Sequence, residues 1–226
     1  MASEINPTDV IRADFDRLAV FEEDTWSHNS AYHAYLLRHA PPRCDHSLDV
    51  GCGTGTFARL LAQRSTQVYA LDLAPEMIRV AQARSGMCPN ITYQVADVLA
   101  WDWPAAQFDC IASIATLHHL PLDIMLAKMA AALRPGGVLL VLDLFQGADW
   151  RDWLVSGLAL PVSLGVRLLK NGRWRESEAA RRAWAQHGPH DVYLPLAQIR
   201  QACAAMLPGA IVRRHLLWRY SIVWRK

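Results

Sequence analysis

The sequence has no excess of charge of either sign. It holds 23 lysines and arginines against 21 aspartates and glutamates, which leaves a formal net charge of +2. A surface for nucleic acid normally needs clustered lysine and arginine, whereas the arginines of the C-terminal part alternate with apolar residues, as on the solvent faces of strands. We therefore expect no nucleic-acid partner.

Cysteine is scarce and follows no pattern. Five cysteines stand at positions 44, 52, 88, 110 and 203, and no C-x-x-C pair occurs. An odd, scattered set of thiols is typical of a protein from a reducing compartment. The N-terminus, Met1–Pro7, has no basic start and no apolar core, so it does not resemble a signal peptide. These two observations predict a cytoplasmic protein.

An uninterrupted apolar run of membrane-spanning length is also missing. The most apolar stretch, residues 149–170, contains Gly157, Pro161, Gly165 and Arg167, and it fits poorly as a membrane span. We interpret it as a buried lid or an interface helix in solution and expect no stable membrane insertion. A contact with a membrane surface stays open, although few basic residues support it. Whether the chain is a monomer or a homodimer stays open too.

What the sequence does contain is a strand, a glycine-rich turn and a helix in immediate succession. Leu48–Val50 is short and apolar, alternate glycines follow at positions 51, 53 and 55, and a helix is predicted from Thr56 to Arg64. This arrangement is the first unit of a nucleotide-binding α/β sheet. Glycine serves there because the backbone turns sharply and passes close to a ligand, where a Cβ would interfere.

The spacing of these glycines separates two classes of nucleotide-binding protein. The dinucleotide fingerprint G-x-G-x-x-G needs a third glycine where this sequence has Thr56. Here the pattern is G-x-G-x-G, with Asp49 in the strand before it and Asp72 at the end of the next strand. This combination closely resembles the signature of the class I S-adenosylmethionine (SAM) methyltransferases. A nicotinamide-dependent oxidoreductase with a degenerate glycine loop is the alternative.

Strands and helices alternate along most of the chain. Strands are predicted at residues 48–50, 68–72, 91–96, 108–113, 138–143, 211–217 and 220–224, the last two as a hairpin. The resemblance covers residues 47–144. It implies an α/β, Rossmann-like three-layer sandwich around a mostly parallel seven-stranded sheet that ends in an antiparallel hairpin.

The chain ahead of the glycine loop predicts two helices, one over Thr8–Glu23 and one from Ser30 to the prolines at positions 41 and 42. We therefore expect N-terminal cap helices in residues 1–46 and a SAM-binding domain in residues 47–226. An insertion or lid is expected at about residues 145–192, where the simple alternation stops.

The resemblance also implies which residues bind the cofactor. Asp49 would order the glycine loop or receive the amino group of SAM, Asp72 would accept hydrogen bonds from both ribose hydroxyls, and Asp97 would accept one from the exocyclic amine of adenine. Met77 would pack beside the adenine ring. The full set is Asp49, Gly51, Cys52, Gly53, Gly55, Asp72, Leu73, Met77, Asp97, Val98, Ser113 and Ile114.

Two histidines, His118 and His119, follow the fourth predicted strand, at the edge of the sheet where α/β proteins bind ligands. The His-His-Leu sequence resembles small-molecule members of the family. One of the two could act as the catalytic residue that accepts a proton from the acceptor, since imidazole titrates near neutrality. Alternatively, a histidine only holds the loop through backbone hydrogen bonds. No third ligand stands at metal spacing, so we expect no bound metal.

Polar and aromatic side chains also crowd into one N-terminal segment, at Trp26, His28, Asn29, Tyr32 and His33. They predict either a cap over the cofactor and the substrate or a half-buried helix whose rings pack on the sheet.

The resemblance implies a SAM-dependent methyltransferase that moves a methyl group to a small-molecule acceptor by in-line displacement and releases S-adenosylhomocysteine. The apolar stretch inside the expected insertion suggests an apolar or aromatic acceptor. A SAM-binding protein with a regulatory or structural role and no turnover is the alternative.

Overall fold

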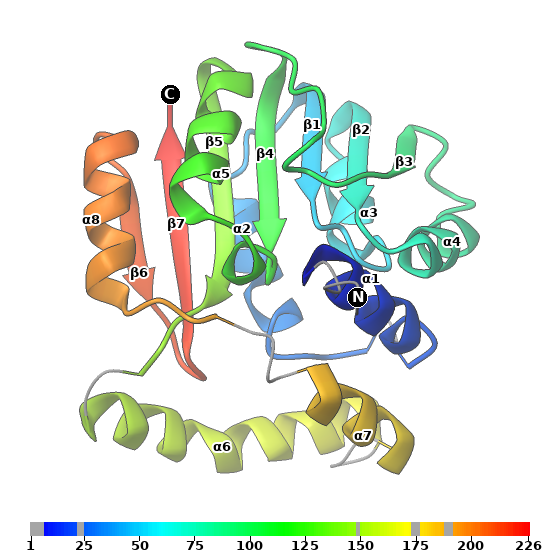
Figure 1. The fold of residues 1–226 in the computed structure, drawn as a ribbon, viewed down its shortest axis with the longest axis vertical. Coiled ribbons are helices and arrows are strands. Elements are labelled where there is room, and N and C mark those ends of the chain that lie inside the picture. The colour runs from blue at the N-terminus through cyan, green and yellow to red at the C-terminus, as the bar shows by residue number, and fades with distance from the viewer. Residues whose placement is uncertain (1–6, 22–24, 148–149, 173–176, 188–191) are drawn as a thin grey trace, which may run out of the picture.

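A seven-stranded sheet forms the middle layer of the molecule (Figure 1). The computed structural model describes residues 7–21, 25–147, 150–172, 177–187 and 192–226. In this part of the chain the strands are β1 (Cys44–Val50), β2 (Ser65–Asp72), β3 (Ile91–Val95), β4 (Phe108–Ile114), β5 (Leu133–Leu144), β6 (Ile211–Arg214) and β7 (Arg219–Arg225). Their order is β3-β2-β1-β4-β5-β7-β6. β7 runs antiparallel to both of its neighbours, and the other neighbouring pairs are parallel. The predicted fold class is confirmed.

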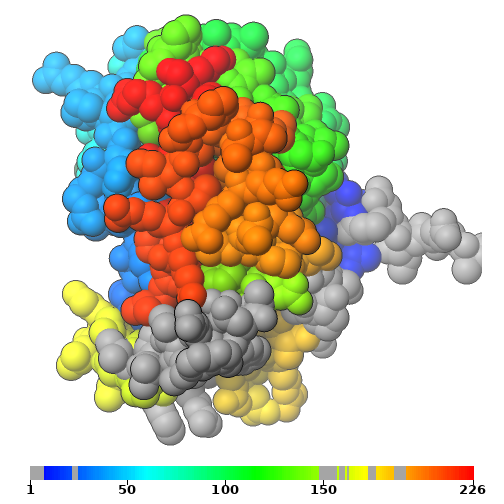
Figure 2. Space-filling view, turned by 90° about the vertical axis from the view of Figure 1, so that its left-hand side faces the viewer, coloured from blue at the N-terminus to red at the C-terminus, as the bar shows by residue number. Residues whose placement is uncertain are grey.

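Helices cover both faces of this sheet, as expected for a parallel sheet whose strands are apolar on both sides. α5 (Leu122–Ala132) and α8 (Leu196–Met206) pack on one face, and α2 (His33–His39), α3 (Thr56–Ala62) and α4 (Pro75–Arg84) pack on the other. Alternate residues of β5 point to opposite cores: Leu139 and Val141 to the first, Leu140 and Leu142 to the second. Seen from the side, α8 lies beside β6 and β7 at the edge of the sheet (Figure 2).

Three further helices lie at the edge where the parallel strands end (Figure 1). They are α1 (Pro7–Leu18), α6 (Trp150–Asn171) and α7 (Glu178–His187). Leu18 of α1 and Met77 of α4 share a small separate core, against which Phe15 and Ala183 pack. Oδ1 of Asp16 also accepts the Glu76 N–H at 2.9 Å, in the first turn of α4. α1 is thus held over the carboxyl edge of the sheet.

The N-terminal part differs in detail from the sequence prediction. α1 ends at Leu18, and the last two residues of the predicted helix, 22 and 23, lie outside the described residues. The second predicted helix is split into a 3-10 turn, η1 (Ser30–Tyr32), and α2. β1 begins at Cys44, ahead of the predicted start at Leu48, because Cys44 already pairs with Ser65 of β2.

The sequence Arg134-Pro135-Gly136-Gly137, which is typical of a turn, lies inside β5. Phe108 of β4 pairs with Leu133, and Cys110 pairs with Val138, so four residues of β5 bulge out opposite one residue of β4. Gly136 adopts a φ of +79°, a conformation that glycine enters without strain. The sequence signal for a turn was therefore real, but strand pairing continues on both sides of it.

The apolar stretch forms one continuous helix, α6, which runs through its glycines and Pro161. An interior proline removes one backbone hydrogen bond, which a helix of 22 residues can lose and still continue. Pro161 is exposed, and so are Leu164, Leu168 and Leu169. No helix in the described part of the chain is long and apolar enough to cross a bilayer.

Candidate active site

The glycine loop after β1 is built from three left-handed residues. Gly51, Gly53 and Gly55 have φ values of +70°, +52° and +77°. A Cβ on Gly51 would lie 2.1 Å from Oγ1 of Thr116, and one on Gly55 would lie 2.3 Å from the hydroxyl of Tyr93. A Cβ on Gly53 would meet no atom within 4 Å. Two of the glycines therefore allow close packing of the loop, and the middle one borders open space.

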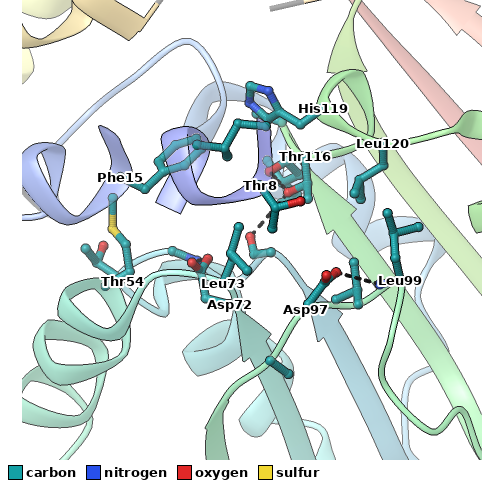
Figure 3. A pocket seen from close by; sticks show the side chains of 18 of the residues that line it. Thr8, Phe15, Thr54, Asp72, Leu73, Asp97, Leu99, Thr116, His119 and Leu120 are labelled. Carbon is teal, nitrogen blue, oxygen red and sulfur yellow. Dashed lines mark hydrogen bonds between the residues drawn. The ribbon is translucent and has the colours of Figure 1, made fainter. Parts of the chain in front are cut away.

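That space is a cavity at the carboxyl edge of the sheet, which we call the glycine-loop cavity (Figure 3). Its walls come from the glycine loop, the ends of β2, β3 and β4, α1 and α7. The lining residues are Thr8, Ile11, Phe15, Asn29, Gly51, Gly53, Thr54, Asp72, Leu73, Met77, Ala96, Asp97, Val98, Leu99, Ile114, Ala115, Thr116, His119, Leu120 and Trp184. The strand order reverses between β1 and β4, so the cavity lies where open α/β sheets bind ligands.

Asp72, the last residue of β2, ties the glycine loop to the next helix. Its Oδ2 accepts the Gly53 N–H at 2.8 Å, and its Oδ1 accepts the Ala74 N–H at 2.9 Å. Burial raises the pKa of Asp72 to about 6, against the opposing effect of the hydrogen bonds from Ala74 and Gly53, and the charge of Asp16 raises it further. The Asp72 carboxylate thus lies at the cavity wall, where it can accept hydrogen bonds from a ligand or attract a cationic one.

Asp49 lies beneath the loop in β1 and is only 1% exposed. Its Oδ2 accepts no hydrogen bond from the described residues. Burial, and then the negative charge of Asp72, raise the pKa of Asp49 to about 7. Two carboxyl groups that repel each other in a buried place gain from a positive charge nearby, because such a charge favours their ionised forms.

Asp97 holds the turn after β3. Its Oδ1 accepts the Leu99 N–H at 2.9 Å, and the carboxylate points toward the cavity (Figure 3). Next to it, Val98 is buried, and Met77 on α4 supplies another apolar side chain of the same cavity. An acid beside apolar side chains suits a flat ring that carries one hydrogen-bond donor.

Of the residues predicted to bind the cofactor, eight line the glycine-loop cavity: Gly51, Gly53, Asp72, Leu73, Met77, Asp97, Val98 and Ile114. Asp49, Cys52, Gly55 and Ser113 do not line it. Ser113 is fully buried, and its hydroxyl donates to the Val50 carbonyl at 3.1 Å. Cys52 is buried in the loop itself. Asp49, Cys52 and Ser113 therefore support the backbone around the cavity without lining it.

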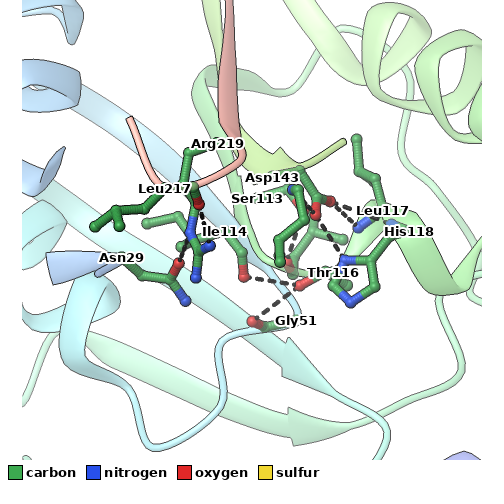
Figure 4. Close-up of polar contacts among 12 residues, drawn as sticks. Asn29, Gly51, Ser113, Ile114, Thr116, Leu117, His118, Asp143, Leu217 and Arg219 are labelled. Atoms are coloured by element: carbon green, nitrogen blue, oxygen red, sulfur yellow. Dashed lines mark hydrogen bonds and ion pairs between the residues drawn. The ribbon is translucent and has the colours of Figure 1, made fainter. Parts of the chain in front are cut away.

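His118 and His119 lie side by side but line different spaces: both line a second cavity, and His119 alone also lines the glycine-loop cavity. Nδ1 of His118 lies 2.6 Å from Oδ1 of Asp143 at the end of β5, and Oδ2 of the same carboxylate accepts the N–H groups of Leu117 at 2.6 Å and His118 at 3.2 Å (Figure 4). Leu144 donates its N–H to Oδ1 at 2.6 Å. The aspartate therefore orients both the imidazole and the loop that carries it.

A second cavity adjoins the first, and we call it the His118 cavity. It is lined by Ile11, Leu117, His118, His119, Leu120, Pro121, Leu122, Leu144, Val192, Leu194, Ile199 and Tyr220. Ile11, His119 and Leu120 line both cavities, so the two spaces meet at these residues. The ring of His119 lies 3.9 Å from that of His118 and makes an edge contact with Phe15.

Among the predicted cap residues, only Asn29 lines the glycine-loop cavity. Its Oδ1 accepts from Nε of Arg219 at 2.8 Å, which connects the N-terminal segment to β7 (Figure 4). The Trp26 N–H donates to Oδ1 of Asn171, at the end of α6, at 3.0 Å. Burial and the positive charges of Arg219 and Arg167 lower the pKa of His28 to about 4.

The other two predicted cap residues pack on the body of the domain. Tyr32 donates its hydroxyl to the Leu216 carbonyl at 3.3 Å and lies against the ring of His215. His33 packs against Phe57 of α3, and burial lowers its pKa to about 4. These two rings contact other parts of the domain and do not line the glycine-loop cavity.

Several cavity residues were not singled out from the sequence. Ile11 and Phe15 were visible only as the apolar side of an amphipathic helix, and Trp184 as part of an exposed one. Ala115 has a left-handed φ of +52° and donates its N–H to the Leu142 carbonyl at 2.7 Å. Nothing in the local sequence predicts that an alanine adopts a left-handed conformation at this position. His187 ends α7, and residues 188–191, which include His190, lie outside the described residues.

The fold and the cavity together define a doubly wound α/β protein that binds a nucleotide-like ligand at its switch point. Residues 48–137 match the family described as "Methyltransferase domain". An uncharacterised methyltransferase of Mycobacterium tuberculosis is 31% identical over 210 residues, which cover 90% of this chain and 98% of the relative. A ubiquinone biosynthesis O-methyltransferase of Xylella fastidiosa is 33% identical over 194 residues, 78% of this chain and 77% of the relative.

Among solved structures, the N-methyltransferase NodS of Bradyrhizobium japonicum in complex with S-adenosylhomocysteine aligns with a TM-score of 0.65 and 18% identity, over 96% of this chain and 98% of that one. This likeness shows the fold. The chain belongs to the class I SAM-dependent methyltransferases, and its cofactor is S-adenosylmethionine.

Proposed function

We propose that this methyltransferase acts on a small-molecule acceptor, which it binds next to the methyl donor. The observation that carries the proposal is the meeting of two cavities at Ile11, His119 and Leu120. One of them borders the glycine loop, and the other is enclosed mainly by apolar side chains. The Xylella fastidiosa relative is an O-methyltransferase of ubiquinone biosynthesis by name, which supports a small-molecule acceptor.

The glycine-loop cavity fits the donor. The open space beside Gly53 leaves room for a ligand against the backbone, and Oδ2 of the buried Asp49 accepts no hydrogen bond from the described residues. A positively charged amino-acid group above the loop would relieve the repulsion between Asp49 and Asp72. We assign Asp72 to the ribose hydroxyls, and Asp97, with Met77 and Val98, to the adenine.

The cap in this proposal consists of the N-terminal helices and part of the insertion. Ile11 and Phe15 of α1 line the glycine-loop cavity from above the strand ends, and Trp184 of α7 lines it from the insertion. Asn29 joins them through its contact with Arg219. The described side chains of α6 do not line either cavity. We therefore propose residues 1–46 and α7, rather than α6, as the parts that close the site.

SAM supplies an electrophilic methyl group on a sulfonium, and the reaction is a direct displacement. The chain contributes by holding the acceptor in line with that methyl group, which is worth on the order of 7–11 kcal/mol for well-oriented reactants. The apolar walls of the His118 cavity exclude water from the acceptor. We propose His118 or His119 as the group beside the reacting atom.

The first experiment is thermal unfolding with SAM, with S-adenosylhomocysteine and with NADH. A ligand at about one hundred times its dissociation constant stabilises a protein by roughly 2.7 kcal/mol. We expect the two sulfur ligands to raise the midpoint by several degrees and NADH to leave it unchanged. Release of S-adenosylhomocysteine in the presence of candidate small molecules then tests the acceptor class. Turnover only with a protein or a nucleic acid would contradict a small-molecule acceptor.

A cytoplasmic location also belongs to this proposal. All five cysteines are free thiols, and four of them are buried. Free thiols are the rule in a reducing compartment. Alkylation of the protein in intact cells, followed by mass spectrometry, would test it, since an oxidised disulfide would contradict the assignment.

A further inference from the structure

α6 turns a polar face toward the rest of the domain. Ser163, Arg167 and Asn171 are spaced four residues apart, so they share one face of the helix. Ser163 is buried, and Arg167 and Asn171 are half-buried. Asn171 ties this face to the N-terminal segment, because its Oδ1 accepts the Trp26 N–H at 3.0 Å and its Nδ2 donates to the Trp26 carbonyl at 2.9 Å.

The opposite face of the same helix is apolar and exposed. Leu164, Leu168 and Leu169 are 44%, 52% and 86% exposed, and Pro161 is exposed beside them. These four residues recur at helical spacing, and we call the surface that they form the outer face of α6. An amphipathic helix of a globular protein normally packs its apolar side on the core. Leucines that point away from the core indicate a surface that another body covers.

The position of α6 suits contact with an extended surface. The helix runs along the outside of the molecule, on the side where the parallel strands end (Figure 1). It has 22 residues. A helix of this size is about 33 Å long. Its outer face can therefore lie flat against a large, even surface.

The sequence around the outer face is positively charged. Residues 153–175 contain Arg167, Lys170, Arg173 and Arg175 and no aspartate or glutamate. The rest of the chain holds the remaining 19 of the 23 basic residues and all 21 acidic ones, so this segment carries a formal charge of +4 and the remainder −2. Lys170 is exposed in the last turn of α6. Exposed leucines among basic residues fit a surface that is both apolar and negatively charged.

We propose that the outer face of α6 docks on the surface of a lipid bilayer that contains anionic lipids. Leu164, Leu168 and Leu169 enter the boundary between headgroups and acyl chains, and Lys170 contacts lipid phosphates. A second copy of the chain fits this face less well, because two segments of charge +4 would meet in a symmetric interface. The carboxyl edge of the sheet then faces the bilayer (Figure 1). The inference does not depend on which molecule accepts the methyl group.

The first test is co-sedimentation of the full-length protein with vesicles. One set of vesicles is pure phosphatidylcholine, and the other also contains about 30% phosphatidylglycerol, which gives a negative surface potential. We expect binding to the anionic vesicles to be at least tenfold tighter and to weaken as salt is added, because salt screens exposed charges. Equal binding to both sets, or binding to neither, would overturn the proposal.

Substitutions on the outer face locate the contact. Leu168→Asp combined with Leu169→Asp should weaken binding to anionic vesicles at least tenfold. Ile211→Asp is the matched control, since its side chain is also 52% exposed but lies on β6, and it should stay within twofold of the wild type. Lys170→Gln should weaken binding about fivefold, the size expected for one basic residue at an anionic surface. Affinity for S-adenosylhomocysteine within twofold shows that each variant is folded. Wild-type vesicle binding by the double variant would assign the contact to another surface.

A fluorescent label tests the same contact without adding a charge. Cys88→Ser serves as the background, because Cys88 is the half-exposed thiol and the other four cysteines are buried. A nitrobenzoxadiazole group on Leu168→Cys should shift its emission to the blue when anionic vesicles are added, and the same group on Ile211→Cys should not. No shift at position 168, or equal shifts at both positions, would contradict the docking.

Light scattering without vesicles tests a second copy as the occupant. We expect the double variant with Leu168→Asp and Leu169→Asp to have the same mass in solution as the wild type. A wild-type dimer that these substitutions convert into a monomer would assign the outer face of α6 to a partner subunit and overturn the proposal.

Discussion

Oδ1 of Asp143 lies 2.6 Å from Nδ1 of His118, although the two residues are 25 positions apart in the chain. The carboxylate ends β5, and the histidine lies in the turn after β4, the neighbouring parallel strand. Four donors converge on this one side chain, which is 1% exposed. The pair orients the imidazole that lines the His118 cavity.

Removing this carboxylate should destabilise the protein. Asp143→Ala leaves the N–H groups of Leu117, His118 and Leu144 without their acceptor, and we expect a loss of about 2–4 kcal/mol in the free energy of unfolding, since each hydrogen bond to a charged group is worth roughly 1.5–3 kcal/mol and solvent recovers part of it. Asp143→Asn keeps an acceptor oxygen and should cost less. Urea denaturation measures both, with the exposed Asp102→Ala as the control. Equal stability of the alanine variant and the wild type would contradict the hydrogen-bond assignment.

Asp72 should contribute mainly to the binding of the methyl donor, SAM. Asp72→Ala is expected to weaken SAM binding by tens-fold or more, because two hydrogen bonds to a charged acceptor at roughly 1.5–3 kcal/mol each are lost. Calorimetric titration measures the affinity, and the melting temperature without ligand shows how far the loss of the Gly53 and Ala74 bonds disturbs the loop. Asp102→Ala again serves as the control. Unchanged affinity would remove Asp72 from the donor site.

The stability of the ligand-free protein should fall as the pH rises from about 4 to about 7. The pKa values of Asp49 and Asp72 are raised from 3.8 to about 7 and about 6, so in this window the folded state holds protons that the unfolded state has lost. Asp49→Asn removes one of these groups and should raise the melting temperature at pH 8, by roughly 2–4 °C for each kcal/mol gained. Thermal scans at pH 5 and pH 8 test this, and an Asp49→Asn variant with the wild-type pH dependence would refute it.

The same two carboxyl groups should make SAM binding depend on pH in the opposite sense. Below pH 6 they are protonated and lose their attraction for a cationic ligand, so we expect the affinity to drop about tenfold or more between pH 8 and pH 5.5, at about 1.4 kcal/mol per pKa unit. The measurement is calorimetry at both values. In Asp49→Asn the drop should be smaller. An affinity that is the same at both pH values would argue against charge as the basis of recognition.

Alanine substitutions at two glycines should separate folding from binding. Both substitutions place an alanine in the left-handed region, which lowers the free energy of unfolding by about 1–2 kcal/mol. Gly51→Ala adds a collision with Thr116 and should destabilise the fold more, and Thr116→Ala should relieve part of that extra loss. Gly53→Ala meets no atom in the protein but projects into the cavity, so it should lower SAM affinity with less damage to stability. Equal effects of the two substitutions on both melting temperature and affinity would contradict this division.

Much of the fold could be predicted from short stretches of sequence. The glycines at 51, 53 and 55 and the acids at 49 and 72 are close in the chain, and local backbone geometry with strand ends brings them to one edge of the sheet. The hairpin of β6 and β7 was likewise marked by local alternation. What local patterns could not predict is how far strand pairing extends, as at the bulge of β5. The extent of pairing depends on neighbouring strands that are distant in sequence.

The sequence by itself determined the glycine loop, its acids and the alternation of strands and helices along the chain, because these depend on backbone conformation and on apolar patterns of short range. Only the tertiary structure decided that His118 faces Asp143, that Asn29 meets Arg219, and that α1 rather than α6 lines the cavity. Each of these is a contact between elements far apart in the chain. Such contacts follow from the packing of whole helices against a sheet, and no pattern within one element specifies them.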